Sequence, residues 1–120
     1  MDPRFVESGA AWYSSPVAGE LTVVLKNGGP GKLFYLRVHN TTGAVIFIFV
    51  FDANSAAGAL VMPPFAVPAN GDLELKLPSP AVANVPNVSG TAGLTISAST
   101  GATAYVAAGA NAMQAHALFK

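Results

Sequence analysis

Short β-rich runs separated by turn residues recur along most of this 120-residue chain, and their spacing constrains its fold most strongly. Twelve glycines and nine prolines, with asparagines and aspartates, end the runs at intervals close to the ~8–12 residues typical of sandwiches and barrels. The pattern predicts an all-β domain, an antiparallel, jelly-roll-like β-sandwich of seven or eight short strands. We expect strands at residues 21–26, 33–39, 44–51, 60–62, 73–77, 94–99, 102–107 and 113–119.

Two segments do not follow this pattern. Residues 1–19 mix turn residues with three aromatics, Phe5, Trp12 and Tyr13, and predict an extended N-terminal arm ahead of a sandwich domain over residues 20–120. The aromatics of the arm either pack on their own domain or reach a neighbouring subunit, since aromatic residues commonly anchor interfaces. Residues 78–92 predict a long loop, because prolines, asparagines and a glycine interrupt them.

The run at residues 44–51 is apolar on both faces, unlike an ordinary strand of a two-layer sandwich. One face, either that of Val45, Phe47, Phe49 and Phe51 or else that of Ile46, Ile48 and Val50, would form an exposed apolar stripe unless something covers it. The cover could be the arm, the 78–92 loop or another subunit. We favour another subunit, because only 10% of the residues are charged, against a usual ~25%.

Charge and hydropathy exclude several classes of partner. Six basic and six acidic residues are spread singly, so no Lys/Arg cluster could follow a phosphate backbone, and we expect no nucleic-acid partner. The longest apolar run has eight residues, and a membrane span needs ~20, so we expect no membrane partner. Residues 108–118 are alanine-rich, but Gly109 and Asn111 interrupt them, which favours a closing strand over a helix.

Catalytic and metal-binding patterns are missing, so we expect neither an enzyme nor a cofactor. Two histidines and no cysteine leave no cluster with metal-ligand spacing, and His39 would at most meet Asp52 across a hairpin. Asp72 and Glu74 share one face of one strand and predict its solvated side rather than a hydrolytic pair. The triplets beginning at Asn40 and Asn87 match the glycosylation pattern, which we interpret as chance in turn-rich sequence.

Four segments, taken in order, give the chain a resemblance to a known family. They are GKLFYLRVHNTT at residues 31–42, FIFVFD at 47–52, PFAVPANG at 64–71 and GLTISAST at 93–100. Together the segments resemble a recurring type of small virion protein of tailed bacteriophages, over about residues 20–107. Residues 78–92 depart from the family pattern, which is shorter there.

The resemblance implies a virion structural role, as a capsid decoration (cement) protein on the outer capsid surface bound to the major capsid protein. Such proteins often form trimers with β-sandwich or jelly-roll bodies and arms lying on the capsid. An alternative is a fibre, head-fibre or adhesin-type module binding a host glycan or protein, for which the candidate residues are Tyr35, His39 and Tyr105. A tail-tube or connector component also fits. The interface residues we expect are Phe5, Trp12, Tyr13, Phe47, Phe49 and Phe51.

Overall fold

The computed structural model describes residues 10–83 and 92–120, and in these parts the chain forms eight strands and no helix. The predicted all-β fold is therefore confirmed. The strands are β1 (Ala11–Ser14), β2 (Thr22–Asn27), β3 (Gly31–Asn40), β4 (Ile46–Phe51), β5 (Phe65–Val67), β6 (Asp72–Ala83), β7 (Gly93–Ser99) and β8 (Met113–Phe119).

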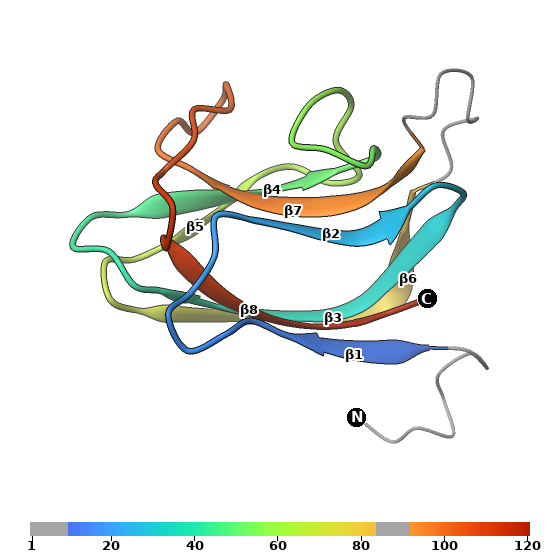
Figure 1. The fold of residues 1–120 in the computed structure, drawn as a ribbon, viewed down its shortest axis with the longest axis horizontal. Coiled ribbons are helices and arrows are strands. Elements are labelled where there is room, and N and C mark those ends of the chain that lie inside the picture. The colour runs from blue at the N-terminus through green and yellow to red at the C-terminus, as the bar shows by residue number, and fades with distance from the viewer. Residues whose placement is uncertain (1–9, 84–91) are drawn as a thin grey trace.

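The strands form two four-stranded sheets packed face to face, as Figure 1 shows. Sheet A has the order β1-β8-β3-β6, and sheet B has the order β2-β7-β4-β5. All pairings between named strands are antiparallel. This is a β-sandwich, with β3 and β8 at the centre of sheet A and β7 and β4 at the centre of sheet B.

The core lies between the two sheets and is built from the inward residues of each strand. Alternation along β7 turns Leu94, Ile96 and Ala98 into it, while β8 contributes small alanines that let the sheets approach. The largest fully buried apolar side chains are Leu33, Leu36, Ile46, Ile48, Leu94, Ile96, Met113, Val38, Val50 and Val67.

Successive strands mostly alternate between the sheets. Among the strands of the described residues, only β4 and β5 are consecutive in sequence and members of the same sheet. The turn at residues 40–43, expected to close a hairpin, therefore carries the chain from β3 in sheet A to β4 in sheet B. His39 and Asp52 consequently do not face each other across a hairpin.

Four segments differ from their predicted structure. The strand expected at residues 60–62 is only an isolated bridge, Leu60 to Phe51, and the strand that follows is β5. Within the expected arm, Ala11–Ser14 form β1, which pairs with β8 at the edge of sheet A. Within the expected loop at 78–92, the first six residues continue β6, and their prolines are tolerated because β6 is an edge strand. Residues 102–107 contribute only an isolated bridge, Ala107 to Ser99, because β7 already pairs with β2 and β4.

Candidate binding surface

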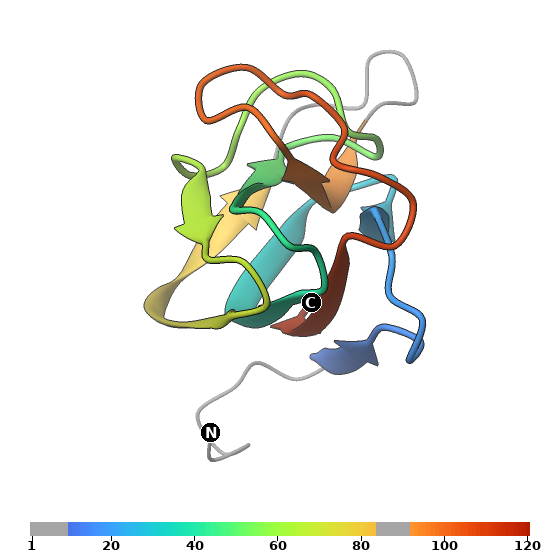
Figure 2. The ribbon, with the colours of Figure 1, turned by 90° about the vertical axis from the view of Figure 1, so that its left-hand side faces the viewer.

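The two outer faces of the sandwich differ, because the chain covers one of them. Loops at residues 52–60 and 100–108 lie over sheet B, as the green and orange segments at the top of Figure 2 show. Beneath them the outward residues of β7, namely Thr95, Ser97 and Ser99, are fully buried. The loops hold these hydroxyls: Thr95 Oγ1 donates to the carbonyl of Ala53 at 2.8 Å, and Ser97 Oγ lies 2.6 Å from the Tyr105 hydroxyl.

The apolar stripe of β4 lies under the same loops. Phe49 and Phe51 are each 3% exposed and stack with centroids 5.8 Å apart, and Tyr105 meets both rings edge to face. Phe47 packs at the margin of this cluster and is half-buried. The cover expected from the arm, the 78–92 loop or another subunit thus comes from two other loops of the same chain. Phe49 and Phe51 leave almost no surface for a partner.

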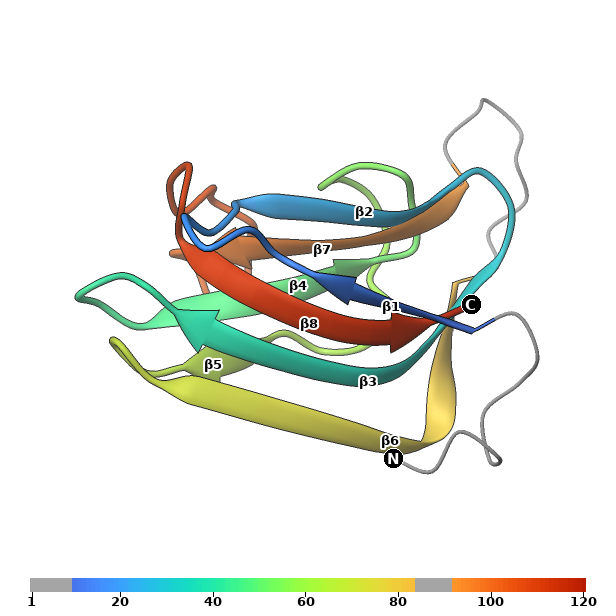
Figure 3. The same ribbon diagram turned by 60° about the horizontal axis from the view of Figure 1, so that its bottom comes forward.

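The outer face of sheet A is bare by comparison. In Figure 3 this sheet faces the viewer, and no described segment runs across its outer side. Because every second residue of a strand points outward, the strand register sorts its side chains into rows across the sheet. The three rows are Trp12–Leu118–Tyr35–Lys76, Ser14–His116–Arg37–Glu74 and Gln114–His39–Asp72.

An aromatic pair stands at one end of this face. Trp12 is 60% exposed, and its ring meets Tyr35 edge to face with centroids 5.6 Å apart. Leu118 is in register with both residues, on the strand between them, and is itself buried. The exposed indole is therefore supported by a well-packed row.

Polar contacts link the charged side chains of the face. The Tyr35 hydroxyl donates to Glu74 at 2.5 Å, and Lys76 lies 3.7 Å from the same carboxylate. The hydrogen bond to Glu74 raises the pKa of Tyr35, and the same bond from Tyr35 lowers the pKa of Glu74.

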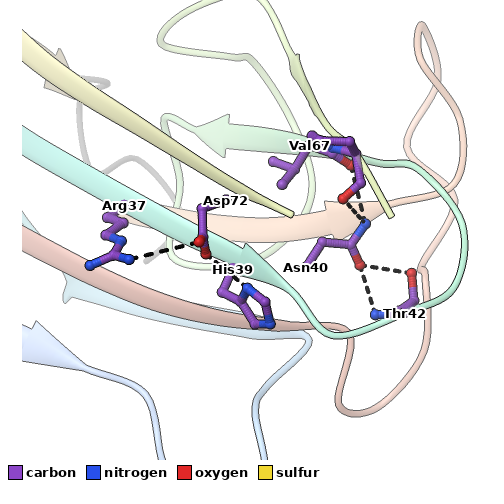
Figure 4. Close-up of polar contacts among 7 residues, drawn as sticks. Arg37, His39, Asn40, Thr42, Val67 and Asp72 are labelled. Carbon is purple, nitrogen blue, oxygen red and sulfur yellow. Dashed lines mark hydrogen bonds and ion pairs between the residues drawn. The ribbon is translucent and has the colours of Figure 1, made fainter. Parts of the chain in front are cut away.

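Asp72 is the centre of a second polar group (Figure 4). Its carboxylate lies 3.7 Å from the Arg37 guanidinium and 2.8 Å from Nδ1 of His39. Asp72, rather than the expected Asp52, is thus the partner of His39. Both carboxylates of β6 act as acceptors that hold the side chains of β3 in place.

A groove of about 590 Å³ runs over these rows. A smaller hollow of about 310 Å³ continues it past His39, Asp72 and Gln114, and the two share Arg37 and His116. Small-molecule sites usually measure ~300–1,000 Å³, so the groove has the size of a ligand site. Its lining residues are Trp12, Ser14, Tyr35, Arg37, Glu74, Lys76 and His116.

The predicted site residues separate into different regions. Phe5 lies outside the described residues. Trp12 lies on the outer face of sheet A, whereas Tyr13, next to it in β1, packs against the core and donates its hydroxyl to Glu20. Among the candidates for glycan recognition, Tyr35 and His39 share the bare face, while Tyr105 lies on the opposite sheet.

Several residues of the groove were not among the predicted site residues. Because alternate residues of a strand share a face, Tyr35, Arg37 and His39 fall on one face of residues 33–39, and Asp72 and Glu74 share the solvated face expected for their strand. What no sequence signal supplied was the pairing of β1 with β8, which brings Trp12 and His116 to the same groove.

Among the described residues, no three His, Cys, Asp or Glu side chains are placed to hold a metal ion. Within the same residues, no helix has the length and apolarity to cross a membrane. Comparisons of the chain with family models, curated proteins and solved structures gave no match. The bare, polar and aromatic face of sheet A is thus the candidate functional surface.

Proposed function

We propose that the chain is a non-enzymatic structural protein of a virion, a decoration protein that binds the outer capsid surface and holds neighbouring major capsid subunits together. Support comes first from the ordered segments of the resemblance. They fall on β3 in sheet A and on β4, β5 and β7 in sheet B, so the resemblance includes three of the four strands of sheet B and a central strand of sheet A. Scarce charge, at 10% of residues, suits a protein that buries surface against partners.

The observation that carries the proposal is the position of β1. This strand pairs on one side only, with β8, so the segment ahead of Ala11 joins the body at an edge of sheet A. We propose that residues 1–9, including Phe5, attach the protein to the capsid from that edge. Many copies on a symmetric shell, associated as trimers, would let weak individual contacts act together.

The test is a truncation that stops short of β1. A variant lacking residues 1–9 keeps the pairing of β1 with β8 that the structure describes, so its unfolding free energy should stay close to that of the full chain. Its co-sedimentation with capsid shells should fall at least tenfold. A variant lacking residues 1–19 is an unsuitable probe, because it also loses Tyr13, which packs against the core. It would also begin at Glu20, so that the bridge from Glu20 to Met113 would lie at the free end of the chain.

Two results would oppose the proposal. One is full capsid binding by the variant that lacks residues 1–9. The other is a copy number in purified particles of only a handful, because a decoration protein is expected at about one copy per capsid subunit, whereas a few copies indicate a tail or vertex component. Light scattering on the full chain measures the trimer directly.

A further inference from the structure

We propose that the outer face of sheet A is a carbohydrate-binding site. In it Trp12 receives the apolar face of one sugar ring, and the side chains of Arg37, Glu74 and Asp72 bind hydroxyl groups of the adjoining rings of the same oligosaccharide. This inference goes beyond capsid decoration and does not depend on it, since it rests on residues from Trp12 onward, whereas capsid attachment is proposed for residues 1–9.

The aromatic end of the groove suits a sugar ring. The C–H groups of a pyranose form an apolar face that packs on a flat aromatic ring, and an exposed indole offers the largest such surface. In an edge-to-face contact, such as that between Trp12 and Tyr35, the face of only one of the two rings is covered. Trp12 is thus held by a neighbour and still 60% exposed.

The polar part of the groove suits hydroxyl groups in particular. A hydroxyl donates one hydrogen bond and accepts others, so it can bridge a carboxylate and a nitrogen donor. Such pairs stand side by side here: Glu74 is in register with Arg37, and Asp72 is in register with His39. A sugar with neighbouring hydroxyls could place one oxygen at each member of a pair.

The charge balance disfavours other ligand classes. An anionic ligand such as a phosphate would meet Glu74 and Asp72, and a cationic one would meet Arg37 and Lys76. An apolar ligand would have to remove water from all four charges without replacing it. A neutral polyol is the class of ligand that can form hydrogen bonds with both the acidic and the basic side chains of the groove.

The side chains are held in position before a ligand arrives. Glu74 accepts from Tyr35, Asp72 contacts both Arg37 and His39, and Ser14 Oγ lies 3.0 Å from Nδ1 of His116. All of them stand on strands of one sheet, so little ordering accompanies binding. Four strands at spacings of ~4.8 Å make a face about 14 Å wide, which suits a short oligosaccharide lying across the strands.

The experiment uses the full chain and its own fluorescence. Trp12 is the chain's one tryptophan, so the emission reports on the groove alone. Full-length protein is first screened on an array of neutral oligosaccharides built from hexoses and N-acetylhexosamines. Titration with the best array sugar should shift the emission to shorter wavelength and reduce quenching by acrylamide, because a stacked ring shields the indole.

Variants then separate the groove from the rest of the surface. Trp12→Ala should weaken binding of the array sugar at least tenfold, Trp12→Phe should recover part of the loss, and Glu74→Gln should weaken binding several-fold. Val17→Ala is the matched control, since Val17 is 92% exposed and does not line the groove. Unfolding curves of each variant establish that the fold is intact.

Four outcomes would overturn the proposal. The first three are no array signal, a sugar titration that leaves the Trp12 emission unchanged, and Val17→Ala weakening binding as much as Trp12→Ala does. A fourth is loss of capsid binding by Trp12→Ala together with unaltered sugar binding, which would make the face a protein interface. The variant lacking residues 1–9 should keep full sugar binding, so failure of capsid attachment and failure of the carbohydrate site are distinguishable.

Discussion

Asn40 shows how much of this fold depends on a single buried polar side chain. It is 0% exposed at the point where the chain leaves sheet A for sheet B. Its amide nitrogen donates to the carbonyls of Ala44, Val67 and Pro68, and its oxygen accepts from the backbone and hydroxyl of Thr42, as Figure 4 shows in part. The same burial makes this asparagine unavailable as a glycosylation acceptor in the folded domain.

Asn40→Ala should destabilise the protein strongly. Each buried partner left without a hydrogen bond costs roughly 1–3 kcal/mol, and since water can reach some of them we expect a total loss of about 3 kcal/mol. Urea unfolding followed by circular dichroism measures the loss. Asn111→Ala, at an exposed asparagine, should change stability by less than ~0.5 kcal/mol. A loss equally small for Asn40→Ala would contradict the role given to its amide.

Tyr13 predicts a stability change at alkaline pH. Burial, together with the hydrogen bond to Glu20, raises the pKa of Tyr13 from 10.0 to about 12. The folded protein therefore holds the phenol proton more tightly than the unfolded chain does. The contribution to stability is complete below pH 10 and is lost as the pH rises toward 12.

The comparison of wild type with Tyr13→Phe isolates this effect. The stability difference between them at pH 7 should shrink by on the order of 1 kcal/mol at pH 11, less than a full shift would give because the hydroxyl is only part-buried. Urea unfolding at the two pH values provides the measurement. If the difference is the same at both, the hydrogen bond to Glu20 has no part in the pH dependence.

At the scale of elements, the loops over sheet B cover its outer face, as a third layer of structure does in larger domains. The loop at residues 100–108 brings Tyr105 onto Phe49 and Phe51, and Ser99 holds that loop by accepting from the backbone of Val106 at 2.9 Å. Without this cover, β4 would expose an apolar stripe on a flat sheet, which is a common cause of aggregation.

Tyr105→Ala should therefore expose β4 while the two sheets remain folded. We expect a stability loss of about 2 kcal/mol, below the ~3–5 kcal/mol for a fully buried aromatic ring, with binding of a hydrophobic dye and concentration-dependent self-association. Dye fluorescence and sedimentation velocity measure these changes. Val106→Ala, at an exposed neighbour, should show neither. A Tyr105→Ala protein that binds no dye would mean that another part of the chain covers Phe49 and Phe51.

At the scale of the whole molecule, the sandwich is one-sided. In the part of the chain that the structure describes, loops cover sheet B, and sheet A presents an uncovered face whose rows come from four strands. The strands of that face begin as far apart as residues 11 and 113, and alternate crossings between the sheets bring them together. An open surface of this kind, seen among residues 10–83 and 92–120, is consistent with the binding that we propose.

Local pattern was enough to determine several of the strands. Period-two alternation and turn residues located β3, β7 and β8 to within two residues, because the signals for a strand lie inside the strand. Alternation also placed Tyr35, Arg37 and His39 together, since side-chain direction follows directly from position along a strand. The requirement that the two-faced run at 44–51 be covered also follows from sequence alone.

Only the tertiary structure decided which strands are neighbours and what covers the apolar run. The turn after Asn40 has the length of a hairpin turn. The buried side-chain amide of Asn40, however, donates to the carbonyls of Val67 and Pro68, and these hydrogen bonds fix the chain where it passes from sheet A to sheet B. Ala11–Ser14 form a strand because they pair with β8, and the sequence of these four residues alone does not predict that pairing. Strand partners and loop packing depend on contacts between residues that are distant in sequence. The sequence therefore predicted strands and the need to cover residues 44–51. The loop contacts determined that sheet B is the covered sheet and that sheet A has the open face.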